Sequence, residues 1–215
     1  MGKNEPMGGI EYSIFIKVIK AIAKAIEEKK EYLTELDAAI GDADHGINMA
    51  RGFRAVQKRL DHIASQDIGN LLRSIGMILI SEVGGASGPL YGTAFIEAAR
   101  VAQGKNEVDQ KDLIEMGKAA LEGIKRRGRS ERGEKTMIDA IEPALEAFKA
   151  SDSVVEGLKQ AAEAAQVGVK ETERMIARKG RASYLGSRSI GHQDPGAASS
   201  ALMISIAYQI LKGGI

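Results

Sequence analysis

The stretch Asp37-Ala-Ala-Ile-Gly-Asp-Ala-Asp-His-Gly-Ile-Asn48 lies between two apolar helical patterns and contains three carboxylates, one histidine and two glycines. Carboxylates this close together repel one another, and they remain ionised together where a cation lies between them. Ligand sets made only of oxygen suit Mg2+ or Ca2+ better than Zn2+, and the chain has no cysteine to offer. The stretch therefore predicts a magnesium site.

Helix capping is the alternative explanation for Asp42 and Asp44, because an aspartate before a helix accepts hydrogen bonds from its first N–H groups. For a single aspartate we would prefer capping, but three within eight residues favour a cation site. An EF-hand does not fit, because its loop needs a glutamate at the twelfth position and counting from Asp42 gives Phe53. His45 alone is weak evidence, since a single histidine is often a surface or capping residue.

Composition indicates one soluble domain over residues 1–215. A chain of this length buries about 70% of its unfolded surface, which a single core can account for. The 30 basic and 29 acidic residues give a net charge of +1, which argues against a nucleic-acid-binding protein. The lack of cysteine fits a reducing compartment, and the sequence shows neither the pattern of a signal peptide nor that of a membrane span. We expect a cytoplasmic protein with no membrane partner.

Apolar residues repeat at helical spacing along nearly the whole chain. Ile10, Ile14, Val18, Ile22 and Ile26 are four residues apart with charges between them, as in an amphipathic helix. No segment shows the alternation typical of strands, and neither heptads nor repeated units are visible. The pattern predicts an all-α protein with eight helices, at about residues 10–31, 47–64, 68–83, 89–102, 110–127, 135–149, 154–178 and 196–211, with Pro143 kinking the sixth.

The connections between these helices are of two kinds. If consecutive helices run antiparallel, as short links require, every second connection lies at the same end of the molecule. One set of links consists of ordinary turns, at 65–67, 103–109 and 150–153. The other set holds the aspartate stretch, the Gly-rich turn at 84–89, the turn at 128–135 and the Gly- and Arg-rich loop at 179–195. Helix capping by glycine is the alternative for any one loop, but four at one end predict a binding site.

Phosphate is the ligand that this set of residues suits best. Magnesium held by a few carboxylates keeps positions open for substrate phosphates, and glycine-rich turns ahead of helices supply N–H groups for the same anions. Ser87 and Asn48 add side-chain donors, and a nucleotide with two Mg2+ ions balances the three carboxylates. We therefore expect phosphoryl transfer, in which the protein contributes positioning and charge neutralisation. The stretch 128–136 is one residue longer than a P-loop and follows a helix instead of a strand, so we discount it.

Four motifs, long and in a fixed order, occur in these unusual connections. They are Gly41-Asp42-Ala43-Asp44-His45-Gly46, Gly84-Gly85-Ala86-Ser87-Gly88-Pro89-Leu90, Lys135-Thr136-Met137, and the segments 178–186 and 189–197, which read RKGRASYLG and SIGHQDPGA. Together they resemble the L-subunit family of dihydroxyacetone kinases, over nearly the whole chain. The chain departs from the family pattern at Glu134, where an aspartate usually precedes Lys-Thr-Met.

The resemblance implies a closed barrel of eight antiparallel helices with a nucleotide site at one end. It implies that Asp37, Asp42 and Asp44 hold two Mg2+ ions that bridge the nucleotide phosphates. Met137 would pack on the base. The full set of cofactor-binding residues that it implies is His45, Gly46, Ile47 and Asn48 with Ala86 and Ser87 at the phosphates, and Gly128, Met137, Arg181, Asp194, Pro195 and Gly196 around the rest of the nucleotide.

The resemblance also implies an activity and two partners. The L subunit would transfer phosphate from bound ATP to dihydroxyacetone held by a separate K subunit, and a phosphohistidine protein of the phosphotransferase system would rephosphorylate the tightly bound ADP. A length of 215 residues leaves no room for a K domain, which favours this branch of the family. The alternatives are a two-chain ATP-dependent kinase for another small ketose or sugar, and a nucleotide-binding regulatory subunit.

Overall fold

Helices make up most of the computed structural model, which describes residues 9–60, 62–63 and 67–213. Within those residues there are nine α-helices, one 3-10 helix and one pair of two-residue strands. The predicted helical class is therefore confirmed. None of the helices in these ranges is long and apolar enough to span a lipid bilayer.

The elements follow one another with short connections. The α-helices are α1 (Tyr12–Glu28), α2 (Lys30–Ile40), α3 (His45–Leu60), α4 (Ile68–Glu82), α5 (Ser87–Val101), α6 (Gln110–Gly128), α7 (Ile138–Lys149), α8 (Val154–Thr172) and α9 (Pro195–Lys212). The 3-10 helix η1 (Arg181–Ser189) lies between α8 and α9. The strands β1 (Ile10–Glu11) and β2 (Glu107–Val108) pair antiparallel, with Ile10 opposite Val108.

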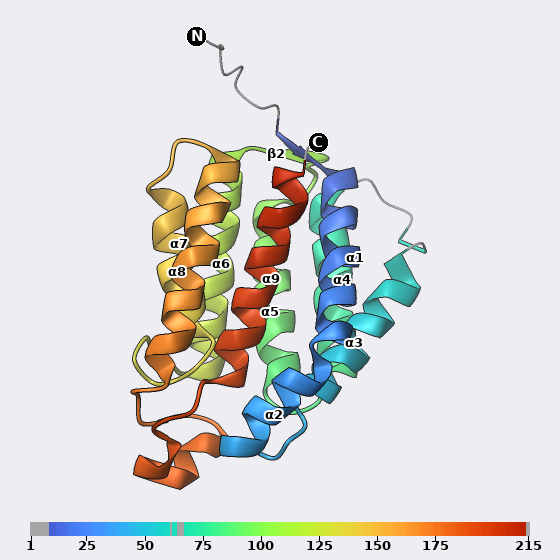
Figure 1. The fold of residues 1–215 in the computed structure, drawn as a ribbon. Coiled ribbons are helices and arrows are strands. Elements are labelled where there is room, and N and C mark those ends of the chain that lie inside the picture. Colours follow the sequence, from blue (N-terminus) through green and yellow to red (C-terminus); the bar gives the residue numbers. More distant parts are fainter. Residues whose placement is uncertain (1–8, 61, 64–66, 214–215) are drawn as a thin grey trace.

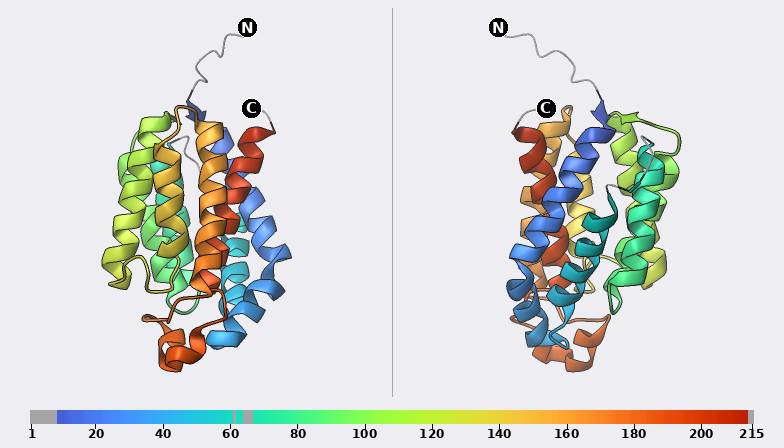
Figure 2. Two further views of the ribbon diagram at one scale, coloured as in Figure 1. Left: turned by 60° about the vertical axis from the view of Figure 1, so that its left-hand side comes forward. Right: turned by 90° about the vertical axis from the view of Figure 1, so that its right-hand side faces the viewer.

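The long helices lie side by side along one axis, and α2 and η1 cover one end of them (Figure 1). Each of the helices α3 to α8 packs against the next in the chain, α9 also packs against α1, and α1 packs against α3. The two turned views keep α2 and η1 at the same end and β1 at the other (Figure 2). Helix α9 therefore has neighbours from both ends of the sequence.

Glycines allow two pairs of neighbouring helices to approach closely. A Cβ atom at Gly76 of α4 would lie 2.7 Å from the carbonyl oxygen of Gly92 on α5, and one at Gly168 of α8 would lie 2.0 Å from that of Asp139 on α7. Larger apolar side chains, among them the fully buried Phe53, fill the space between the helices. The apolar core thus occupies the length of the helices and leaves the polar connections at their ends.

The predicted helix at 10–31 is in fact two helices. Helix α1 ends at Glu28, and Lys29 leaves the helical conformation with φ −100° and ψ 11°. Helix α2 then continues to Ile40 and buries Leu33 and Asp37. The break lets α2 turn across the end of the other helices, which a continuous helix could not do (Figure 1). Asp37, which the sequence placed in a loop, therefore lies on a helix whose backbone holds it in position.

Helix α8 ends at Thr172, although the sequence predicted a helix to about residue 178. The carbonyl oxygens of Thr172 and Met175 accept hydrogen bonds from the Nζ atom of Lys135, at 2.6 and 3.4 Å. After Thr172 the backbone N–H groups bond to the carbonyl three residues back instead of four, as that of Met175 does to Thr172 at 3.2 Å, so the α-helix gives way to a tighter turn. The loop predicted at 179–195 also contains the short helix η1.

Helix α7 begins at Ile138 instead of residue 135, because Lys135 has a φ of 62°, which a right-handed helix excludes. The helix runs through Pro143, and the kink expected there stays a prediction. The predicted link at 65–67 and the end of the preceding helix fall partly on residue 61 and residues 64–66, which lie outside the described residues. The strand pair was not predicted, since two residues are too few to show an alternating pattern.

Candidate nucleotide and metal site

One cavity, of about 510 Å3, lies where the four unusual connections meet. That volume is within the range of about 300–1,000 Å3 found for pockets that bind small molecules. Its lining includes the aspartate stretch, the turn at 84–89, the turn that follows α6 and the segment between α8 and α9, with Asp37, Asn48, Ser87, Leu90, Arg127, Lys135, Met137, Lys179, Arg181 and Asp194 among the residues. The alternation of helix directions had predicted this meeting of the four connections.

The three predicted metal ligands form an acidic cluster. One oxygen each from Asp37, Asp42 and Asp44 can be chosen so that all lie within 4.8 Å of one another, with Asp37 buried and Asp42 exposed. Oxygens bound to a single Mg2+ at about 2.1 Å lie at most about 4.2 Å apart. The cluster is therefore slightly wider than the ligand sphere of one ion. Carboxylate oxygens are the ligands that Mg2+ prefers.

The backbone around the cluster explains how the carboxylates are held. The Oδ2 atom of Asp37 accepts hydrogen bonds from the backbone N–H groups of Asp44, at 2.8 Å, and His45, at 3.1 Å. These bonds join α2 to the start of α3. A Cβ atom at Gly41 would lie 2.1 Å from the other carboxylate oxygen of Asp37, so a side chain there would displace the carboxylate. The first N–H groups of α3, which have no acceptor within the helix, consequently begin beside the acidic cluster.

His45 is buried beside the same cluster. Its Nδ1 atom lies 3.1 Å from the Ser87 hydroxyl oxygen, and its Nε2 atom lies 2.9 Å from that of Ser199. Burial lowers the pKa of His45, while the charges of Asp37 and Asp44 act in the opposite direction. Both ring nitrogens therefore have hydroxyl partners within the protein, and Ser87 lies between the imidazole and the cavity.

The turn at 84–89 places Ser87 at the first position of α5. Gly85 has a φ of 66°, a conformation that side chains rarely adopt. Gly84 lies against α3, where a Cβ atom would be 2.8 Å from the side-chain oxygen of Asn48. The turn can therefore approach Asn48 and present the N–H groups at the start of α5 to the cavity.

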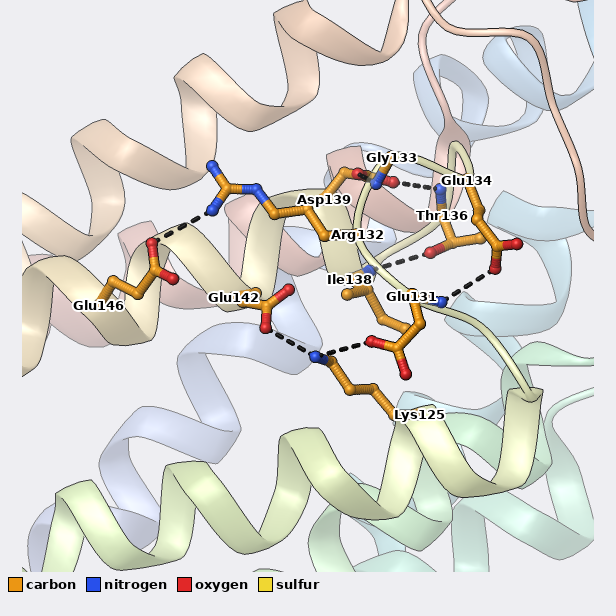
Figure 3. Close-up of polar contacts among 10 residues, drawn as sticks. All are labelled: Lys125, Glu131, Arg132, Gly133, Glu134, Thr136, Ile138, Asp139, Glu142 and Glu146. Carbon is orange, nitrogen blue, oxygen red and sulfur yellow. Dashed lines mark hydrogen bonds and ion pairs between the residues drawn. The ribbon is translucent and has the colours of Figure 1, made fainter.

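The turn that follows α6 is fixed by its own side chains (Figure 3). The Asp139 carboxylate accepts hydrogen bonds from the backbone N–H groups of Gly133, at 2.5 Å, and Thr136, at 2.8 Å. The Glu134 carboxylate accepts one from the N–H of Glu131 at 2.9 Å. Glu134 thus stabilises its own turn. The turn positions Met137, which is buried at the cavity wall.

Two ion pairs made by Lys125 join this turn to the helices on either side (Figure 3). The Lys125 ammonium lies 3.0 Å from the Glu131 carboxylate and 2.7 Å from that of Glu142. These contacts raise the pKa of Lys125 to about 12, chiefly through the hydrogen bonds to Glu142 and Glu131. The lysine therefore remains charged at physiological pH and links α6 to α7.

The segment between α8 and α9 closes the cavity from the other side. The Arg181 guanidinium lies 3.0 Å from the Asp42 carboxylate, so that the segment contacts the acidic cluster directly. Asp194 caps α9 by accepting a hydrogen bond from the N–H of Ala197 at 2.7 Å. Burial raises the pKa of Asp194 to about 7, against the stabilising effect of that hydrogen bond. Arg127 and Lys179 also line the cavity and add positive charge for an anionic ligand.

Most of the predicted site residues lie at the cavity. The residues brought together there are Asp37, Asp42, Asp44, His45, Asn48, Ala86, Ser87, Gly128, Met137, Arg181, Asp194, Pro195 and Gly196. Gly46 and Ile47 do not line it: the side chain of Ile47 is half exposed, and Gly46 packs against the backbone of α2. Only their N–H groups, at the start of α3, remain available for the predicted role.

Sequence reasoning missed the hydroxyl groups behind His45. Tyr91 and Ser199 are buried and connect to the imidazole. The spacing of Ser87 and Tyr91, four residues apart, could have placed both on one face of a helix. Ser199 gave a weaker signal, as a serine in a nearly apolar helix. Nothing in the sequence apart from their charge indicated that Arg127 and Lys179 would line the cavity.

The chain is similar to known proteins over most of its length. The sequence profile of the DAK2 domain matches residues 39–209. The chain is 48% identical to the PEP-dependent dihydroxyacetone kinase, ADP-binding subunit DhaL, of Escherichia coli (strain K12), over 83% of this chain and 87% of that protein. It is 43% identical to the ADP-binding subunit DhaL of PEP-dependent dihydroxyacetone kinase 1 of Listeria innocua, over 90% of this chain and 94% of that protein.

A solved structure shares the fold. The dihydroxyacetone kinase from C. freundii in complex with AMP-PNP and Mg2+ matches with a TM-score of 0.74 and 26% sequence identity, over 97% of this chain and 36% of that chain. Our chain therefore corresponds to about a third of that longer kinase, as its 36% coverage shows. Because the domain profile covers most of the sequence and the bacterial relatives are similar over nearly their whole length, the chain belongs to the DAK2 domain family.

Proposed function

We propose that this chain is the ADP-binding subunit of a phosphotransferase-dependent dihydroxyacetone kinase. It transfers phosphate from a bound nucleotide to dihydroxyacetone that a separate K subunit holds, and a phosphohistidine protein then restores the nucleotide. The observation that carries the proposal is the single cavity that combines three carboxylates with helix N-termini and cationic side chains. Similarity to subunits named as ADP-binding, over nearly their full length, supports the substrate and the partners.

The proposed ligand arrangement follows the chemistry of the lining. Asp37, Asp42 and Asp44 hold two Mg2+ ions, which would neutralise phosphate charge when bound. The N–H groups at the start of α3 and α5 and the Ser87 hydroxyl bind the phosphates. Met137 packs on the base. The other members of the proposed nucleotide site are His45, Gly46, Ile47, Asn48, Ala86, Gly128, Arg181, Asp194, Pro195 and Gly196.

The architecture proposed around this site is one domain, a closed barrel of eight antiparallel helices with the nucleotide at one end. The contact of α9 with both α1 and α8 supports closure. In this arrangement α2 and η1 enclose the phosphates and reduce their contact with water, while the exposed side remains free for the K subunit. We further propose that the nucleotide is tightly bound, so that it acts as a cofactor, and that the protein works in the cytoplasm.

A reconstituted transfer assay tests the proposed function. We expect the chain, mixed with a K subunit, Mg2+, dihydroxyacetone and a phosphohistidine donor, to form dihydroxyacetone phosphate over many turnovers with only stoichiometric ADP. Formation of the product without this chain would refute the role as an enzyme subunit. Turnover that requires free ATP and ignores the phosphohistidine donor would instead identify an ATP-dependent two-chain kinase. Nucleotide binding without any transfer would indicate a regulatory subunit.

A further inference from the structure

A series of hydroxyl groups extends from the interior of the protein to the cavity. The Ser200 hydroxyl oxygen lies 2.8 Å from that of Tyr91, which lies 2.7 Å from that of Ser199. Ser199 contacts Nε2 of His45 at 2.9 Å, and Nδ1 of His45 contacts the Ser87 hydroxyl at 3.1 Å. Ser87 lines the cavity, whereas Ser199 and Ser200 are almost completely buried. Five side chains from α3, α5 and α9 thus form one continuous hydrogen-bonded path.

Three of the hydroxyl groups share one backbone acceptor. The carbonyl oxygen of Gly196 lies within 2.8–3.1 Å of the hydroxyl oxygens of Tyr91, Ser199 and Ser200. That oxygen has two lone pairs, and in a helix the N–H of Ser200 takes one of them. Since it can accept from only one of the three hydroxyls, the others must donate along the path. In any one arrangement, the hydroxyl and ring protons therefore all point the same way along the path.

The protons can be arranged in two directions along the path, and each arrangement gives every side chain of the path a hydrogen-bond partner. In the inward direction Ser87 donates to Nδ1 of His45, the Nε2–H group donates to Ser199, and the series ends on the carbonyl of Gly196. In the outward direction Ser199 donates to Nε2 of His45, the Nδ1–H group donates to Ser87, and the Ser87 proton points into the cavity. The two directions differ in which ring nitrogen of His45 carries the proton.

We propose that Ser199 and Tyr91 are positioning residues that act through His45 to make the Ser87 hydroxyl a hydrogen-bond donor to a phosphate oxygen in the cavity. The proposal rests on the proposed nucleotide function. A phosphate oxygen accepts hydrogen bonds but offers no proton at neutral pH in its ionised form, so its arrival selects the outward direction. Without an anion nothing in the cavity draws the Ser87 proton outward, and we expect the inward direction. On this expectation nucleotide binding moves the ring proton of His45 from Nε2 to Nδ1.

The ring nitrogens of His45 can be observed directly in the wild-type protein. The chain contains three histidines, so 15N-labelled His45 can be assigned by comparison with the His62→Gln and His192→Gln variants. We expect the two ring 15N shifts to indicate the Nε2–H tautomer in the free protein and the Nδ1–H tautomer with AMP-PNP and Mg2+. An Nε2–H tautomer that persists in the complex would overturn the proposal. The measurement needs no change to the path itself.

A double-mutant cycle measures the coupling. We expect Ser199→Ala and Ser87→Ala each to weaken AMP-PNP binding about tenfold, the value of one hydrogen bond to a charged group. The variant with both changes should bind no more weakly than Ser87→Ala alone, because Ser199 acts only through Ser87. Tyr91→Phe should weaken binding in the same way, and its effect should also vanish in the Ser87→Ala background. Ser205→Ala, on the same helix but outside the path, should leave the affinity unchanged.

The outcomes separate this proposal from the proposed function. If the wild-type chain does not bind nucleotide, the proposed function fails. If it binds nucleotide but the effects of Ser199→Ala and Ser87→Ala simply multiply, Ser199 has only a structural role and the proposal fails alone. Circular dichroism checks the helical content of each variant. Should Ser199→Ala not fold, the wild-type 15N shifts and the Tyr91→Phe variant still decide the question.

Discussion

Replacing Asp42 with alanine should weaken Mg2+-dependent ADP binding about 100-fold and leave the fold intact. Loss of a charged ligand costs about 3 kcal/mol, which corresponds to about two orders of magnitude in affinity. Asp42 is exposed, and the Arg181 guanidinium lies 3.0 Å from its carboxylate. An exposed ion pair contributes at most about 1 kcal/mol to stability, so unfolding should change little. Isothermal titration calorimetry with ADP and Mg2+ measures the affinity.

The matched control for this variant is Asp152→Ala, because Asp152 is also an exposed aspartate in a short connection but belongs to the turn between α7 and α8. It should bind ADP as the wild type does. Equal affinities for Asp42→Ala and Asp152→Ala would mean that Asp42 is not a ligand. A large loss of stability in Asp42→Ala would show instead that the carboxylate serves the fold, as the capping interpretation holds.

Replacing Lys135 with methionine should lower the free energy of unfolding by about 3–5 kcal/mol, because buried polar groups would lose their partner. Lys135 is 1% exposed, and its Nζ atom donates to the carbonyl oxygens of Thr172, at 2.6 Å, Ser189, at 2.8 Å, and His192, at 2.5 Å. The methionine side chain has a similar length, and like lysine it carries a Cβ atom that disfavours the φ of 62° at this position. The comparison therefore isolates the effect of the ammonium group. Urea denaturation followed by circular dichroism gives the change.

The same lysine should affect the ligand site, because its carbonyl partners come from α8 and from both sides of the Ser189–His192 turn. Lys135→Met should therefore also weaken ADP binding at temperatures where the variant is folded. The control is Lys118→Met, which removes an exposed ammonium paired with Glu115 and should change stability by less than about 0.5 kcal/mol. If both variants unfold at the same urea concentration, the ammonium of Lys135 is not a structural anchor.

The location of the site could be predicted from the sequence because it depends on a simple geometric rule. Antiparallel helices joined by short links place every second connection at one end, and the four unusual connections occupied those places. The spacing of the three aspartates also predicted a cation site, since carboxylates that close together need a cation to remain ionised. All of the predicted site residues except Gly46 and Ile47 line the cavity, while their roles stay predictions.

What the sequence could not reveal depends on contacts between distant residues. Helix α8 ends at Thr172, where a lysine 37 positions earlier in the chain donates a hydrogen bond to its carbonyl group, and no local pattern records that contact. The break at Lys29 depends on the packing of α2 against α3, which the spacing of apolar residues in the sequence does not show. The link between Tyr91 and Ser199 spans 108 positions and was invisible for the same reason. These long-range polar contacts are what position the binding residues.

The central claim is that the aspartate cluster and the surrounding helix N-termini form one site for a magnesium-bound diphosphate. Calorimetric titration of the nucleotide-free chain with ADP, performed with Mg2+ and again with EDTA, tests it most directly. We predict one ADP bound per chain in the presence of Mg2+ and at least about 100-fold weaker binding in EDTA, because the carboxylates alone repel the phosphates. Equal affinity with and without the metal, or no binding in either, would contradict the claim.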